Sequence, residues 1–132
     1  MRASGRLIVV IATFEDSVLL QRNPRDYPPL WYFPQQYVKT STGGTRSAGR
    51  KMLRWRTRTQ PTVERFHFLK TIGEMPPTHV FTIELTAEEG EFLRLGNGNP
   101  DFESRLFPLA KLDQMRDLKE ENRLLIQKLA EK

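Results

Sequence analysis

The stretch that decides the fold reads LWYFPQQYVKTSTGGTRSAGRKMLRWRT and covers residues 30–57. Its aromatic start favours a short strand at Trp31-Tyr32-Phe33, and TSTGG at Thr40–Gly44 predicts a flexible turn. From Thr45 onward, apolar residues recur at spacings of four and three, which indicates one face of a helix; they are Ala48, Met52 and Trp55. The stretch therefore predicts a strand, a turn and then a helix.

Both ends of this helix are marked in the sequence. Thr45 or Ser47 can act as the N-cap, because a hydroxyl oxygen accepts a hydrogen bond from a free backbone N–H of the first turn. We expect the helix to end near Thr57, because Thr59-Gln60-Pro61 follows it and proline cannot continue a helix.

Strand patterns lie on either side of this stretch. Residues 6–13 (RLIVVIAT) and 17–22 (SVLLQR) predict a hairpin that turns at Glu15-Asp16, and the three prolines of residues 23–30 predict a loop. Alternating residues predict two further strands at 62–70 and 79–86, joined through 73–77. A turn at 96–100 and a short segment at 104–108 come before a terminal amphipathic helix, whose apolar stripe comprises Leu112, Met115, Leu118, Leu125 and Leu129.

Size and composition indicate one soluble globular α/β domain over residues 1–132. The longest apolar run is far shorter than the ~20 residues that span a bilayer, and no secretory signal pattern follows Met1. The chain has no cysteine, which excludes disulfides, thiol nucleophiles and Cys-ligated zinc. We expect a cytoplasmic or organellar-matrix protein that does not contact a membrane.

Charge is distributed unevenly along the chain. The net charge is +5, yet residues 27–63 contain seven basic residues and no acidic one. Such a block is typical of a surface that binds an anionic partner such as a nucleotide or RNA. The alternative is a solvated basic face that only aids solubility.

The order of these elements resembles the Nudix hydrolase fold along nearly the whole chain. Local matches are Val18–Arg22, Leu30–Pro34 and Leu106–Leu112, and their order is more specific than any one of them. The resemblance implies an α/β/α sandwich, with a mixed sheet, a central helix after the Trp-x-Phe-Pro strand and a C-terminal helix. Phe33-Pro34-Gln35 and Ala48-Gly49-Arg50 are also similar to the degenerate motif of the Nudix-like protein in the mitochondrial large ribosomal subunit.

The motif that carries catalysis in this family is degenerate here. Aligning Pro34 with the family's proline puts Gln36 at the opening glycine and Thr42 at the first glutamate. Arg50 matches the family's arginine, but the three following carboxylate positions hold Lys51, Arg54 and Trp55, and Thr57 replaces the last glycine. Family enzymes hold Mg²⁺ on these carboxylates to hydrolyse nucleoside diphosphate derivatives, and lysine, arginine and tryptophan cannot ligate Mg²⁺. The resemblance therefore implies a protein with no catalytic residues, no metal and no cofactor.

We expect five basic residues to bind phosphate: Arg46, Arg50, Lys51, Arg54 and Arg58. Arginine can donate two parallel hydrogen bonds to the oxygens of one phosphate. Like charges four residues apart on a helix also repel each other, and a bound anion removes this repulsion. Trp31, Tyr32 and Trp55 are candidates for base stacking, although each tryptophan could instead fill the core. The predicted partner is RNA or a nucleotide, alone or within a larger ribonucleoprotein.

Two other functions remain open. An atypical pyrophosphohydrolase would need metal-binding carboxylates from outside the motif, such as Glu64, Glu74 or Glu84. Residues Glu84–Gly90 resemble the Glu-Glu-Gly end of the motif, but we discount this similarity, partly because a strand is expected there. A protein-interaction module, for example in a ribosome or as a homodimer through sheet edges or the final helix, would show salt-insensitive association.

Overall fold

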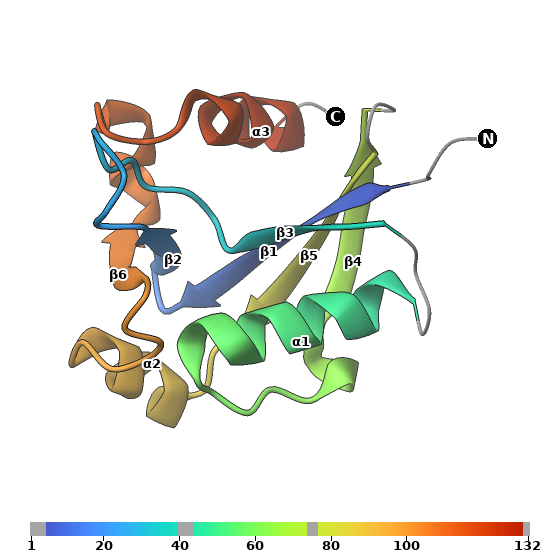
Figure 1. The fold of residues 1–132 in the computed structure, drawn as a ribbon, viewed down its shortest axis with the longest axis horizontal. Helices are drawn as coiled ribbons and strands as arrows, with labels where there is room; N and C mark the ends of the chain where they lie inside the picture. Colours follow the sequence, from blue (N-terminus) through green and yellow to red (C-terminus); the bar gives the residue numbers. More distant parts are fainter. Residues whose placement is uncertain (1–4, 40–43, 74–76, 131–132) are drawn as a thin grey trace.

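The computed structural model describes residues 5–39, 44–73 and 77–130. Thr40–Gly43 of the predicted turn and Glu74 lie outside the described residues. The centre of the sheet is β1 (Arg6–Phe14), which pairs in parallel with β5 and antiparallel with β2 and β3 (Figure 1). The strand order is β4-β5-β1-β2-β6, with β3 paired to β1. The other strands are β2 (Ser17–Arg22), β3 (Gln35–Val38), β4 (His67–Ile72), β5 (Thr78–Glu84) and β6 (Glu103–Pro108).

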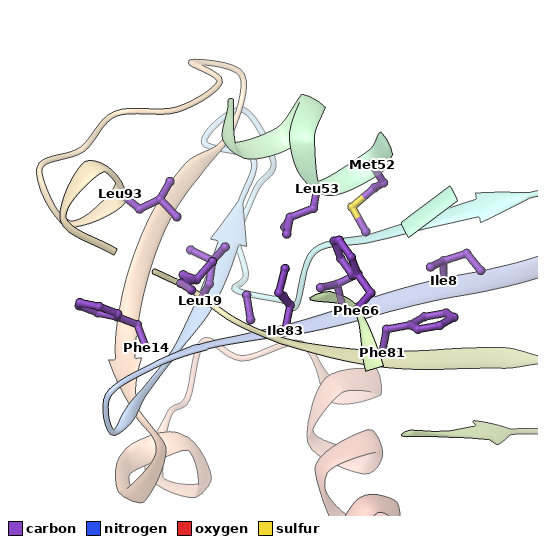
Figure 2. Packing of buried hydrophobic residues seen from close by; sticks show 12 residues of the cluster. Ile8, Phe14, Leu19, Met52, Leu53, Phe66, Phe81, Ile83 and Leu93 are labelled. Carbon is purple, nitrogen blue, oxygen red and sulfur yellow. The ribbon is translucent and has the colours of Figure 1, made fainter. Parts of the chain in front are cut away.

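Helices cover both faces of this mixed sheet, as expected for an α/β/α sandwich. α1 (Thr45–Thr57) and α2 (Ala87–Arg94) pack on one face, and α3 (Glu120–Ala130) packs on the other (Figure 1). Alternation along β1 supplies both cores, because Ile8 and Val10 face the first side while Val9 faces the second. Figure 2 shows Met52 and Leu53 of α1 over Ile8, Phe81 and Ile83. No helix among the described residues is long and apolar enough to span a membrane.

The predicted bounds of α1 are confirmed, but the predicted cap is wrong. Gly44 is the N-cap, with φ 89°, and no side chain of the residues that the structure describes caps the helix. Gly49 is buried and faces β1, where a Cβ would stand 3.4 Å from Cγ2 of Ile8, an ordinary van der Waals contact. Arg58 ends the helix in the left-handed conformation, with φ 59°.

Several predicted elements are corrected. The strand after the proline-rich loop is β3, because Trp31 and Tyr32 form only isolated bridges and Pro34 has no N–H to continue a ladder. Residues 63–65 form a 3₁₀ turn before β4. The predicted C-terminal helix is interrupted: Leu112 lies in a 3₁₀ helix (Leu109–Gln114), Met115 and Leu118 lie in the segment that follows it, and Leu125 and Leu129 lie in α3. α2 was not predicted. Thr86 and Glu89 form a capping box at its N-terminus, in which each side chain accepts a hydrogen bond from the backbone N–H of the other. The strand predicted at 79–86 therefore ends at Glu84, and the helix begins at Ala87.

Candidate functional site

Three cations gather at the C-terminal half of α1. Lys51, Arg54 and Arg58 line a cavity of about 550 Å³ together with Trp55, Gln60 and Asn99. The loop that follows α2 fixes one wall of this cavity: the side chain of Asn99 donates to the carbonyl of Trp55 (3.1 Å), and its backbone N–H donates to the carbonyl of Arg56 (3.4 Å). The last carbonyls of a helix have no partner within the helix, and Asn99 donates to two of them. These two hydrogen bonds fix the position of the loop relative to the end of α1 that carries the cations.

The cations of α1 have no acidic partners among the described residues. Other arginines of the protein do, for example Arg22 with Glu103 (2.7 Å) and Arg65 with Glu89 (2.7 Å). Arg54 and Arg56 lie in the last turn, where the helix dipole favours positive charge, but that interaction is worth less than about 1 kcal/mol at an exposed position. The helix therefore carries a concentration of positive charge that the described part of the protein does not neutralise.

The five predicted phosphate-binding residues do not lie in one group. Arg46 faces β5 and the 3₁₀ turn before β4, since its Nε donates to the carbonyl of Phe66 (2.9 Å) and its guanidinium lies 5.9 Å from the ring centre of Phe81. Arg50 is half-buried and lines neither cavity of the site. The structure thus brings together Lys51, Arg54 and Arg58 and separates Arg46 from them.

The aromatic candidates divide in the same way. Trp31 is 2% exposed and Tyr32 is 7% exposed, so neither ring can stack on a base, and that prediction is corrected. Trp55 is 56% exposed, against the expectation that it lies on the apolar face of the helix. Gly49, Leu53 and Thr57, four residues apart, are buried instead, and this turns Trp55 outward, where it meets Phe102 edge-on at 5.4 Å.

A second cavity, of about 650 Å³, lies between β3 and α1 and shares Lys51 and Trp55 with the first. Its remaining walls are Gln36, Val38, Ala48, Met52, Arg56 and Phe102. Sequence reasoning missed Gln36, Arg56, Gln60, Asn99 and Phe102 as site residues. Arg56 was visible as part of the basic block, whereas the contacts of Asn99 and Phe102 with α1 arise from chain folding across more than 40 residues and leave no local signal.

This arrangement does not fit a magnesium ion. No acidic side chain lines either cavity, and no cluster of three or more metal-ligating residues occurs among the described residues. Of the carboxylates considered as replacements, Glu64 and Glu84 are exposed on other elements. Glu89 was not among these candidates, and its carboxylate already accepts two hydrogen bonds from Arg65 (2.9 and 2.7 Å). These bonds hold the pKa of its carboxyl below the usual range. Hard divalent cations need oxygen ligands, and cations at the aligned positions repel them.

Comparisons with known proteins identify the fold. No family model matches the sequence, and no curated protein matches it. Solved structures do match: a mutT/nudix family protein from Listeria innocua has a TM-score of 0.70 at 17% identity, covering 98% of this chain and 93% of that one. A Nudix-family hydrolase from Clostridium perfringens gives 0.67 at 10% identity, with 97% of each chain covered. The NUDIX domain of Shewanella oneidensis NrtR, in complex with ADP ribose, gives 0.67 at 18% identity, covering 96% and 86%. The chain has the Nudix fold.

Proposed function

We propose that this Nudix-fold protein binds a phosphate-bearing partner, RNA or a nucleotide, and does not hydrolyse it. One observation carries the proposal: Lys51, Arg54 and Arg58 surround one cavity beside an exposed tryptophan and have no acidic partners among the described residues. Two of these residues stand where the sequence alignment puts catalytic carboxylates. The substitution exchanges a metal-binding surface for one that attracts phosphate directly.

The chemistry of the site suits a nucleic acid strand. Arginine and lysine donate to phosphate oxygens without a bridging metal, and an exposed indole offers a surface on which any base can stack. The two adjoining cavities, about 550 and 650 Å³, are each within the size range of ligand sites. The ADP ribose held by the NUDIX domain of NrtR supports the nucleotide alternative, since the same fold there receives a single nucleotide derivative.

Binding of single-stranded RNA is expected to weaken with salt. Each phosphate contact releases counterions, so three cations predict a slope of about −2 when the logarithm of the association constant is plotted against the logarithm of salt concentration. Titration of a labelled oligonucleotide at several salt concentrations measures this slope, and ADP ribose titrated in parallel tests the nucleotide alternative. Failure of both ligands to bind at low ionic strength would contradict the proposal.

Calorimetry with Mg²⁺ and Mn²⁺ is expected to show no site on α1, because its outward positions carry positive charge in place of carboxylates. Turnover of ADP ribose, dinucleoside polyphosphates or oxidised deoxynucleoside triphosphates should likewise remain at background. A metal site lost on replacing Glu64, Glu74 or Glu84, together with metal-dependent turnover, would instead favour the hydrolase interpretation.

A further inference from the structure

The cavity between β3 and α1 differs in character from the cationic cavity beside it. Val38, Ala48 and Met52 give it apolar walls, and Trp55 and Phe102 give it aromatic ones. Its hydrogen-bonding side chains include the amide of Gln36 and the guanidinium of Arg56. Apolar and aromatic walls with a small number of polar groups are typical of a ligand site, in which the polar groups fix the orientation of the ligand and give specificity.

Arg56 is held rigidly in this cavity. Its guanidinium carbon lies 4.2 Å from the ring centre of Phe102 and 5.7 Å from that of Tyr32. Its backbone carbonyl accepts from the side chain of Gln21 (3.3 Å) and from the N–H of Asn99. Both ends of the residue are thus fixed before any ligand arrives, so little conformational entropy remains to be lost on binding.

The hydrogen-bonding capacity of Arg56 is largely unused. A guanidinium has five N–H donors, and the described residues accept only one hydrogen bond from it, at 3.5 Å to Oε1 of Gln21. Its Nε is buried and has no partner within the described structure. A donor at that depth cannot reach a ligand in the cavity, so the donors open to a ligand are those of the two terminal nitrogens, one of which already bonds Gln21.

We propose that this cavity is a guanine site in which Arg56 donates to the O6 and N7 of the base while the ring packs against Trp55. The proposal rests on the proposed function and adds base selectivity to it. Arginine paired with O6 and N7 is the commonest specific contact to guanine, whereas adenine presents an amino group in place of O6. Lys51 and Trp55 line both cavities, so the cationic cavity adjoins the base site and is open to the phosphate of the same nucleotide.

The test compares uridine hexanucleotides that carry one central guanosine, adenosine or cytidine with the all-uridine strand, at one salt concentration. We expect the guanosine strand to bind about tenfold more tightly than the adenosine strand. Quenching of tryptophan fluorescence should accompany binding, because Trp55 is exposed and Trp31 is buried. Equal affinity for all four strands would overturn the guanine site and leave the proposed function standing. No binding of any strand would overturn the guanine site and the RNA form of the proposed function, and the titration with ADP ribose would then decide the nucleotide form.

Variants assign the selectivity to Arg56. Arg56→Lys keeps the positive charge but removes the planar fork, so the guanosine preference should disappear while the salt slope stays the same. Arg116→Lys makes the same chemical change at an exposed position that lines neither cavity and should preserve the preference. Thermal unfolding establishes that each variant is folded; if Arg56→Lys is not, Gln36→Ala on the exposed face of β3 replaces it and should reduce the preference. A preference unchanged in a folded Arg56→Lys protein would contradict the role of Arg56, and one unchanged in Gln36→Ala would contradict that of the cavity.

Discussion

Trp31→Ala is expected to lower the free energy of unfolding by about 3–5 kcal/mol, the range for removing a large aromatic side chain from a core. Trp31 is 2% exposed, meets Phe107 edge-on at 4.8 Å and lies under the guanidinium of Arg22 at 4.4 Å. Its backbone also joins the segment before α3, through hydrogen bonds to Asp117 (2.7 Å) and from Lys119 (2.8 Å). Urea unfolding followed by circular dichroism measures the change.

Trp55→Ala is the matched comparison. Its exposed ring contributes about 1 kcal/mol through the contact with Phe102, so the stability loss should be small. RNA affinity should nevertheless fall about tenfold, because stacking on one base is worth about 1–3 kcal/mol. If Trp55→Ala destabilised the protein as strongly as Trp31→Ala and left RNA affinity unchanged, Trp55 would be a core residue and not a binding residue.

The triple variant Lys51→Gln/Arg54→Gln/Arg58→Gln is expected to lower RNA affinity about 100-fold at low salt and to bring the salt slope close to zero, because all three phosphate contacts are lost. Glutamine is preferable to glutamate here, since carboxylates at Lys51 and Arg54 could create metal ligands. All three side chains are exposed, so the fold should persist.

A control variant separates local contacts from net charge. Arg25→Gln/Lys111→Gln/Arg116→Gln removes the same three charges at exposed positions outside α1 and should change the affinity by less than about threefold. Equal losses in the two triple variants would mean that the protein attracts RNA only through its overall charge, and the cavity would then have no specific role.

The sequence predicted those features that depend on local pattern. The hairpin of β1 and β2 and the extent of α1 are confirmed, because apolar periodicity and a following proline act within a few residues. α2 was missed although its signal was present: Thr86 and Glu89 stand three apart, as in a capping box. The strand predicted at 79–86 extended over Thr86 and masked this signal, whereas β5 ends at Glu84.

The site was predicted only in part. Periodicity placed Met52 correctly on the buried face, but it could not show that Gly49, Leu53 and Thr57 complete this face and leave Trp55 outside it. Charge spacing grouped Arg46 with Arg54, yet Arg46 donates to the carbonyl of Phe66, a contact made only when the 3₁₀ turn before β4 packs beside the helix. The aromatic support of Arg56 likewise depends on Phe102, which follows it by 46 residues.

The two tryptophan indoles allow the most direct test of the central claim that α1 binds a phosphate-bearing strand at Lys51, Arg54 and Trp55. In ¹H–¹⁵N spectra each indole N–H gives its own resonance, and single replacement of Trp55 by phenylalanine assigns them. On titration with single-stranded RNA, we predict that the Trp55 resonance shifts progressively while that of buried Trp31 stays in place. RNA binding that left the Trp55 resonance unmoved would show that the strand binds elsewhere and would contradict this account.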